Sequence, residues 1–223
     1  MKIAQIIISI CILSVVAFCQ ERFVKPVDEA ALDPSFFAFR AKVIAAADRK
    51  DAGFIYGILD PKIQLNFGGD EGIAKFKRTW KLDSSQTRFW TEFSAVVKNG
   101  GSFTRDNGKR TGLFYAPYTF ESFPEDLDAY EYSAIFGSDV NLRKQPAMNG
   151  EIVAKLSYNV VKIESETVPK SGRSEYPGWW QIRTLDGLTG YVKKEYVRSS
   201  IDYRAGFEKK RGVWKMVAFI SGD

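Results

Sequence analysis

Histidine is missing from this chain, and its two cysteines, Cys11 and Cys19, both fall in the first segment. Without histidine the chain cannot form Ser-His-Asp or Cys-His nucleophiles, nor zinc sites that use imidazole ligands. Removal of the first segment would also exclude cysteine nucleophiles, cysteine metal sites and internal disulfides. We therefore expect no catalytic residues, no metal site and no cofactor, and a non-catalytic role is favoured over an enzyme.

A hydrophobic run long enough to span a membrane is missing as well. The apolar stretch Ile3–Phe18 follows a positively charged start and is shorter than the ~20 residues that a transmembrane helix needs. Small residues flank Phe18, which predicts signal-peptidase cleavage before Gln20. We expect residues 1–19 to be a signal peptide, and the mature chain to be periplasmic or secreted, with no integral membrane span. Two alternatives stay open, a retained membrane anchor and a lipid anchor at Cys19. The lipid anchor is disfavoured because lipoprotein signals carry a small residue where Phe18 stands.

Neither charge sign dominates the chain. The formal net charge is +5, and loss of residues 1–19 would leave +4 because it removes only Lys2. The densest basic residues form three short clusters, at 75–78, 193–194 and 209–211. Nucleic-acid binding typically uses a longer basic stripe, so we expect no nucleic-acid partner. In an exported protein, a modest positive charge favours contact with anionic envelope polymers or phospholipid head groups.

The first half of the chain has the pattern of an α+β domain. Residues 20–32 show no clear period and are expected to be a leader, followed by a domain of unknown function over 33–128. Its first helix should begin at Asp33 and Pro34, because Asp accepts hydrogen bonds at an N-cap and proline suits the first helical position. Two further helices are expected over 52–59 and 73–80, and Asp70 should cap the second of them. Another helix should be capped by Ser84 or Ser85 and end before Asn99. A strand is expected over 63–67 and an extended segment over 103–123.

From Tyr130 onward the pattern changes to short strands separated by glycine-containing turns. This spacing predicts a small all-β barrel or sandwich, which we place at residues 129–200. The expected strands are 134–135, 140–142, 152–156, 160–163, 179–183 and 190–192.

The last segment, 201–223, is expected to be a β-hairpin that turns at 209–212. Both faces of its second strand carry apolar side chains, with Phe219 on one face and Trp214 and Met216 on the other. A strand that is apolar on both faces belongs inside a sheet. We therefore expect the hairpin to pack back on the N-terminal unit, which would make the β module an insertion in an α+β fold.

The β module carries a family likeness. Val140–Arg143, followed by Pro146, resembles the opening of bacterial SH3-like (SH3b) domains, and Gly178–Ile182 with Asp186–Val192 resembles their closing strands. The likeness covers about 134–198, with one longer polar insertion at 165–176. The rest of the chain is similar to exported bacterial proteins that contain SH3 domains, a resemblance that implies no activity. The implied fold is a helix-and-strand N-terminal unit plus a small SH3-like barrel.

SH3-like domains recognise peptides in grooves lined by aromatic rings, which offer flat apolar area at low entropic cost. The resemblance implies that Ile182 lies in the core. Because side chains alternate along a strand, we expect Trp180 to share the face of Ile182, whereas Trp179 and Gln181 point to solvent or to a groove. Tyr176 lies in the polar insertion. The predicted groove residues are Trp179, Tyr191, Tyr158 and Tyr196.

Three functional classes stay open. The favoured one is an exported cell-envelope binding or scaffolding protein whose SH3-like module contacts peptidoglycan peptides or an envelope protein. The alternative is an enzyme acting on envelope polymers, with carboxylates and tyrosines such as Tyr115 and Tyr118 in a site between the two domains. A structural stabiliser of a partner protein is the third, and the sequence does not separate it from the first.

Overall fold

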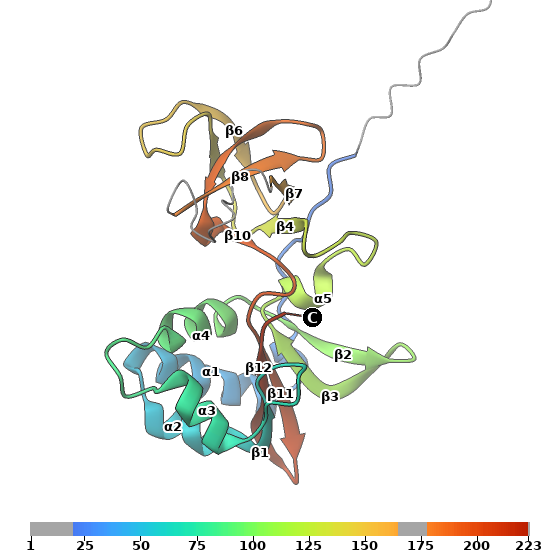
Figure 1. The fold of residues 1–223 in the computed structure, drawn as a ribbon. Coiled ribbons are helices and arrows are strands. Elements are labelled where there is room, and N and C mark those ends of the chain that lie inside the picture. The colour runs from blue at the N-terminus through green and yellow to red at the C-terminus, as the bar shows by residue number, and fades with distance from the viewer. Residues whose placement is uncertain (1–19, 165–177, 223) are drawn as a thin grey trace, which may run out of the picture.

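The computed structural model describes residues 20–164 and 178–222, which form two lobes joined by a narrow waist (Figure 1). The leading lobe comprises residues 27–122 and 203–222, and the β lobe comprises residues 131–198. The predicted signal peptide with Cys19, and the polar insertion with Tyr176, lie outside the described residues. Within the described part of the chain, no helix is long and apolar enough to cross a membrane.

Helices form where the apolar side chains recur at helical spacing. They are α1 (Pro34–Arg49), α2 (Ala52–Ile58), α3 (Ile73–Trp80) and α4 (Phe89–Val97), preceded by a short 3-10 turn, η1 (Ala30–Leu32). The α1 start is as predicted, because the Asp33 side chain accepts hydrogen bonds from the backbone N–H groups of Ser35 and Phe36.

Two predicted helix caps are wrong. Gly72 occupies the N-cap of α3, and the Asp70 carboxylate instead binds Lys75 Nζ at 3.0 Å and the Asn66 side-chain amide at 2.9 Å. Helix α4 begins later than predicted, at Phe89, whose N–H donates to Thr87 Oγ1. Both caps were predicted from residue type alone. The turn before α4 places Thr87 Oγ1 at the first N–H group of that helix, whereas α3 begins without a side-chain cap.

The leading lobe is built on a five-stranded sheet in the order β1-β12-β11-β3-β2. Its strands are β1 (Leu59–Gln64), β2 (Ser102–Asp106), β3 (Lys109–Ala116), β11 (Arg204–Lys210) and β12 (Val213–Ile220). Helices α1–α4 cover one face of this sheet (Figure 1). The predicted strand over 63–67 was placed too late in the sequence, because β1 begins at Leu59, includes Pro61 and ends at Gln64. An edge strand tolerates proline, since its free side needs no N–H donor.

The C-terminal hairpin completes the leading lobe, as predicted. Strand β12 lies between β1 and β11 in the sheet. Strand β11 pairs directly with β3, with Ala205 opposite Ala116, although the whole β lobe separates these two strands in the sequence. Trp214, Met216 and Phe219 are buried in the same core as helices α1–α4. The SH3-like module is therefore inserted between β3 and β11.

The predicted extended segment over 103–123 is interrupted. Strand β3 ends at Ala116, and a single helical turn, α5 (Thr119–Ser122), follows it. Tyr118 and Phe123, on either side of α5, are buried at the waist. The chain folds into a turn here because these rings pack against the β lobe rather than continuing along the sheet.

The β lobe is a seven-stranded antiparallel sheet in the order β10-β4-β7-β8-β9-β5-β6. Its strands are β4 (Tyr132–Ile135), β5 (Val140–Arg143), β6 (Ile152–Leu156), β7 (Val160–Ile163), β8 (Trp179–Thr184), β9 (Thr189–Lys193) and β10 (Val197–Arg198), and a 3-10 turn, η3 (Lys194–Tyr196), precedes β10. Every predicted strand is present. Aliphatic side chains such as Leu142 and Ile182 fill the core.

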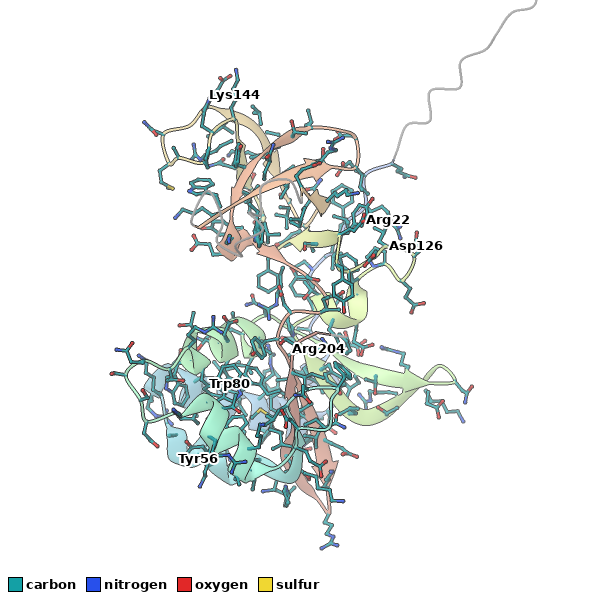
Figure 2. The ribbon with its side chains drawn as sticks, in the orientation of Figure 1. Arg22, Tyr56, Trp80, Asp126, Lys144 and Arg204 are labelled. Atoms are coloured by element: carbon teal, nitrogen blue, oxygen red, sulfur yellow. The ribbon has the colours of Figure 1, made fainter. Side chains whose placement is uncertain are left out.

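The leader joins the two lobes. Its N-terminal part pairs with the β lobe, where Val24 N donates to Tyr158 O and Val160 N donates to Arg22 O, both at 2.8 Å. Its other end pairs with the leading lobe, where Glu29 N donates to Gly101 O at 2.9 Å. Figure 2 shows the Arg22 side chain facing Asp126 at the waist, and their closest N···O distance is 2.7 Å.

Candidate functional site

The outer face of strands β8, β9 and β5 carries two of the predicted groove residues. In the β8–β9 ladder, Trp179 lies opposite Lys193 and Gln181 lies opposite Tyr191, which also pairs with Arg143 of β5. Directly opposite residues in antiparallel strands point to the same face. Trp179 and Tyr191 therefore share this face with two cationic side chains.

The alternation along β8 is as predicted from the sequence. Ile182 is fully buried in the β-lobe core, together with Val192 opposite Trp180. Trp180 packs against this core but remains partly exposed, because its ring lies at the end of the lobe that faces the leading lobe. The side chains of the two adjacent tryptophans thus lie on opposite faces of strand β8.

Trp179 borders a small hollow of about 130 Å³. Tyr196 and Met148, both well exposed, line it with Trp179, and Lys193 and Glu195 form an ion pair at its edge with an N···O distance of 3.6 Å. Flexible Met beside flat aromatic rings is a combination that binding surfaces use, because it adapts to the partner's shape. The structure therefore brings Trp179 and Tyr196 together at this hollow, and Tyr191 lies on the same face of the sheet as Trp179 but outside the hollow.

Tyr158 lies apart from this group. It has a left-handed backbone conformation, with φ of 61°, and lines a different hollow of about 340 Å³ between the lobes. That hollow also includes Tyr118, Phe136 and the leader residue Val27. Residue type alone predicted Tyr158 in the groove with the other aromatic residues, but the turn before β7 places it at the waist.

A hollow of about 1010 Å³ forms a cleft between the lobes. Helix α4 forms one wall, and η3 and β10 of the β lobe form the other. Lys194 Nζ lies 4.2 Å from the centre of the Trp180 ring at this cleft, a cation–π contact. Arg88, Lys194 and Arg198 all line it, and the sequence carried no signal for this grouping because they come from three separate elements.

Arg198 is the most buried charged residue of the cleft, with 9% of its surface exposed. Its Nη2 donates to the carbonyl oxygen of Tyr203, and its guanidinium carbon lies 5.6 Å from the centre of the Phe136 ring. Its Nε is buried and has no hydrogen-bond partner among the described residues. Burial lowers the pKa of the Arg198 guanidinium, and the carboxylates of Asp202 and Glu92 partly oppose this shift.

The tyrosines considered for an enzymatic site do not line this cleft. Tyr115 packs against Phe120, and the Tyr118 ring stacks on Phe136 with a centroid separation of 5.3 Å. Burial raises the pKa of both Tyr115 and Tyr118, which makes their phenols poorer proton donors near neutral pH. Three carboxylates do line the cleft, those of Glu92, Glu195 and Asp202. Within residues 20–164 and 178–222, no group of three or more acidic, histidine or cysteine side chains is arranged to hold a metal ion.

Comparison with known proteins identifies the β lobe. Residues 138–198 match the family model described as bacterial SH3 domain, which spans β5 to β10. A comparison with curated proteins gives no match. The chain therefore contains a bacterial SH3 domain, a binding module, and β4 lies outside the matched residues although it pairs with both β7 and β10.

Proposed function

We propose that this chain is an exported binding protein of the bacterial cell envelope, whose SH3 domain contacts peptidoglycan peptides through the surface around Trp179 and Tyr196. The observation that carries the proposal is the hollow at Trp179, which the half-buried Trp179 ring lines together with the exposed side chains of Tyr196 and Met148. The predicted signal peptide at 1–19 supports the envelope as the compartment. The positive charge of the chain also suits an anionic polymer.

The chemistry of this surface suits a peptide. Exposed rings offer apolar contact, and Arg143, Lys193 and Glu195 at the hollow offer both charge signs for backbone and side-chain polar groups. A few aromatic and arginine residues typically carry most of the binding free energy at such surfaces. Trp179 is the residue of this surface whose truncation should cost the most affinity.

Co-sedimentation of residues 20–223 with purified peptidoglycan sacculi tests the proposal. We expect saturable binding, and Trp179→Ala should weaken it at least about tenfold, the size expected for a central aromatic contact. Phe37→Ala is the control, since Phe37 is an exposed aromatic on α1 of the leading lobe and does not line the hollow at Trp179. That variant should bind like the wild type.

The same samples separate the other functional classes. New muropeptide ends after incubation would replace the binding proposal with the enzymatic alternative, whose site would be the carboxylate-lined cleft. Absence of sedimentation would contradict peptidoglycan as the ligand. Co-purification of one envelope protein at a fixed ratio, lost in Trp179→Ala, would then identify a protein partner for the same surface.

A further inference from the structure

The cleft between the lobes contains a buried cation, Arg198, that makes no ion pair with the described residues. Arg198 is nine-tenths buried, and no carboxylate of the described residues forms an ion pair with it. Its side chain makes one hydrogen bond, to the Tyr203 carbonyl, and leaves Nε without a partner in this part of the chain. A buried charge is costly unless it is paired, so such a group points to a partner that arrives from outside the chain.

The rest of the cleft restricts what this partner can be. Two further cations, Arg88 and Lys194, line it, but so do the three carboxylates of Glu92, Glu195 and Asp202. Those carboxylates would repel a polyanion such as a phosphate polymer, because like charges in a partly dry cleft cost free energy. A ligand that carries both charge signs is favoured instead.

The neutral lining adds to this restriction. Trp180 and Tyr203 supply apolar surface, and the hydroxyls of Thr91, Ser133 and Ser199 supply hydrogen-bonding groups. A volume of about 1010 Å³ lies at the upper end of the range that small-molecule sites occupy. A short peptide has the required chemistry, with amide groups, apolar side chains, a terminal carboxylate and an ammonium group.

We propose that this cleft is a second binding site, which holds a short peptide with its terminal carboxylate at the Arg198 guanidinium. Arginine is suited to this role because its planar guanidinium can donate two parallel hydrogen bonds to a carboxylate. The ammonium group of the peptide faces Glu92 and Asp202. The site uses residues of both lobes, and it is separate from the Trp179 surface of the proposed function, although Glu195 and Tyr196 border both.

Calorimetric titration with a matched pair of peptides tests this site. The probes are an alanine tetrapeptide with one internal lysine and a free carboxylate, and the same peptide as its C-terminal amide. The wild type should bind the acid at least about tenfold more tightly than the amide, because only the acid supplies the counter-ion. Arg198→Gln should reduce this ratio to about one, and Lys144→Gln, at the far end of the β lobe (Figure 2), should leave it unchanged.

Arg198 also holds the Tyr203 carbonyl, so its replacement could disturb the fold. Lys194→Gln, at the cleft beside the Trp180 ring, provides a second test and should lower the acid-to-amide ratio in a folded protein. Equal binding of the two peptides, or no binding at millimolar concentration, would overturn the proposal. Equally strong competition by inorganic phosphate would overturn the peptide assignment and leave a simple anion site.

Two variants distinguish the cleft site at Arg198 from the Trp179 surface of the proposed function. Trp179→Ala should weaken sacculus binding at least about tenfold but keep the tenfold preference for the acid peptide. Arg198→Gln should lose the preference but still sediment with sacculi. If Trp179→Ala abolished the tetrapeptide preference as well, one surface would serve both ligands and the separate cleft site would be wrong.

Discussion

The two lobes of this chain build their cores from different side chains. Large aromatic rings fill the leading lobe, where the fully buried ones are Phe36, Phe76, Phe89, Phe93, Phe103, Phe114, Phe207 and Phe219. The core of the β lobe is aliphatic and smaller, with Val, Leu and Ile side chains. Helices α1–α4 and a five-stranded sheet enclose the aromatic core, whereas the strands of the β lobe enclose its aliphatic core.

The lobes also differ in how far apart in the sequence their paired strands lie. The described strands of the β lobe all come from one continuous stretch, residues 132–198, with 165–177 not described. The leading lobe cannot be completed until β11 reaches β3, with the whole β lobe between them. A folded insertion brings those two strands together and lowers the entropic cost of closing so long a loop. The β lobe is thus expected to be the more autonomous of the two.

The largest effect should come from removing the C-terminal hairpin. A chain that ends at Ser200 loses β11 and β12, which leaves β1 without a strand partner and the aromatic core open to water. We expect the leading lobe to unfold while the β lobe keeps its sheet. Far-ultraviolet circular dichroism and amide NMR would show loss of helix with retention of dispersed strand resonances. Cooperative folding of the leading lobe without residues 201–223 would contradict this comparison.

A smaller effect is expected from truncating one core residue in each lobe. Phe36→Ala removes a ring whose centroid lies 4.3 Å from that of Phe114 and 4.7 Å from that of Trp214, so we expect a loss of about 3–5 kcal/mol. Leu142→Ala in the β lobe should cost about 2–5 kcal/mol. Hydrogen exchange should show reduced protection in the mutated lobe only. Equal loss in both lobes would mean that the waist couples them into one cooperative unit.

The smallest effect on stability should come from replacing one buried carboxylate, that of Asp60, and its contribution to stability should depend on pH. Asp60 of β1 is buried, and its carboxylate accepts from Lys62 N at 2.8 Å and binds Lys210 Nζ of β11 at 3.0 Å. Burial alone would raise the pKa of Asp60, but these donors more than compensate and hold it below its ordinary value. The depressed pKa means that this stabilisation is present above the ordinary Asp pKa of about 3.9 and is lost as the pH falls through the folded value.

Asp60→Asn should therefore lower the free energy of unfolding by about 1–3 kcal/mol at pH 7, as expected for hydrogen bonds to a charged group. The difference from the wild type should shrink below about pH 4. Denaturant titrations at several pH values would measure it. Asp126→Asn, at the exposed ion pair with Arg22, is the control and should change stability less, because solvent screens that pair. A constant difference at all pH values would argue against the charged form of Asp60 as the cause.

Much of the fold was predictable because the local patterns are strong. The Asp33 cap, the strands of the β lobe and the insertion of that lobe were all predicted correctly, the last from the apolar character of both faces of β12. The caps of α3 and α4 and the start of β1 were wrong. Residue type suggests several possible partners for an exposed N–H group, and only the path of the preceding turn selects one of them.

The sequence by itself determined that Trp179 lies on the strand face opposite Ile182, because side chains alternate along a strand, and the SH3-like resemblance places Ile182 in the core. It also excluded chemistry that depends on histidine, since the chain has none. Only the tertiary structure decided that Tyr158 lies at the waist and that Arg198 lies in a cleft opposite α4. The physical reason is that alternation is a property of neighbouring residues, whereas a cleft depends on how two separately folded lobes meet.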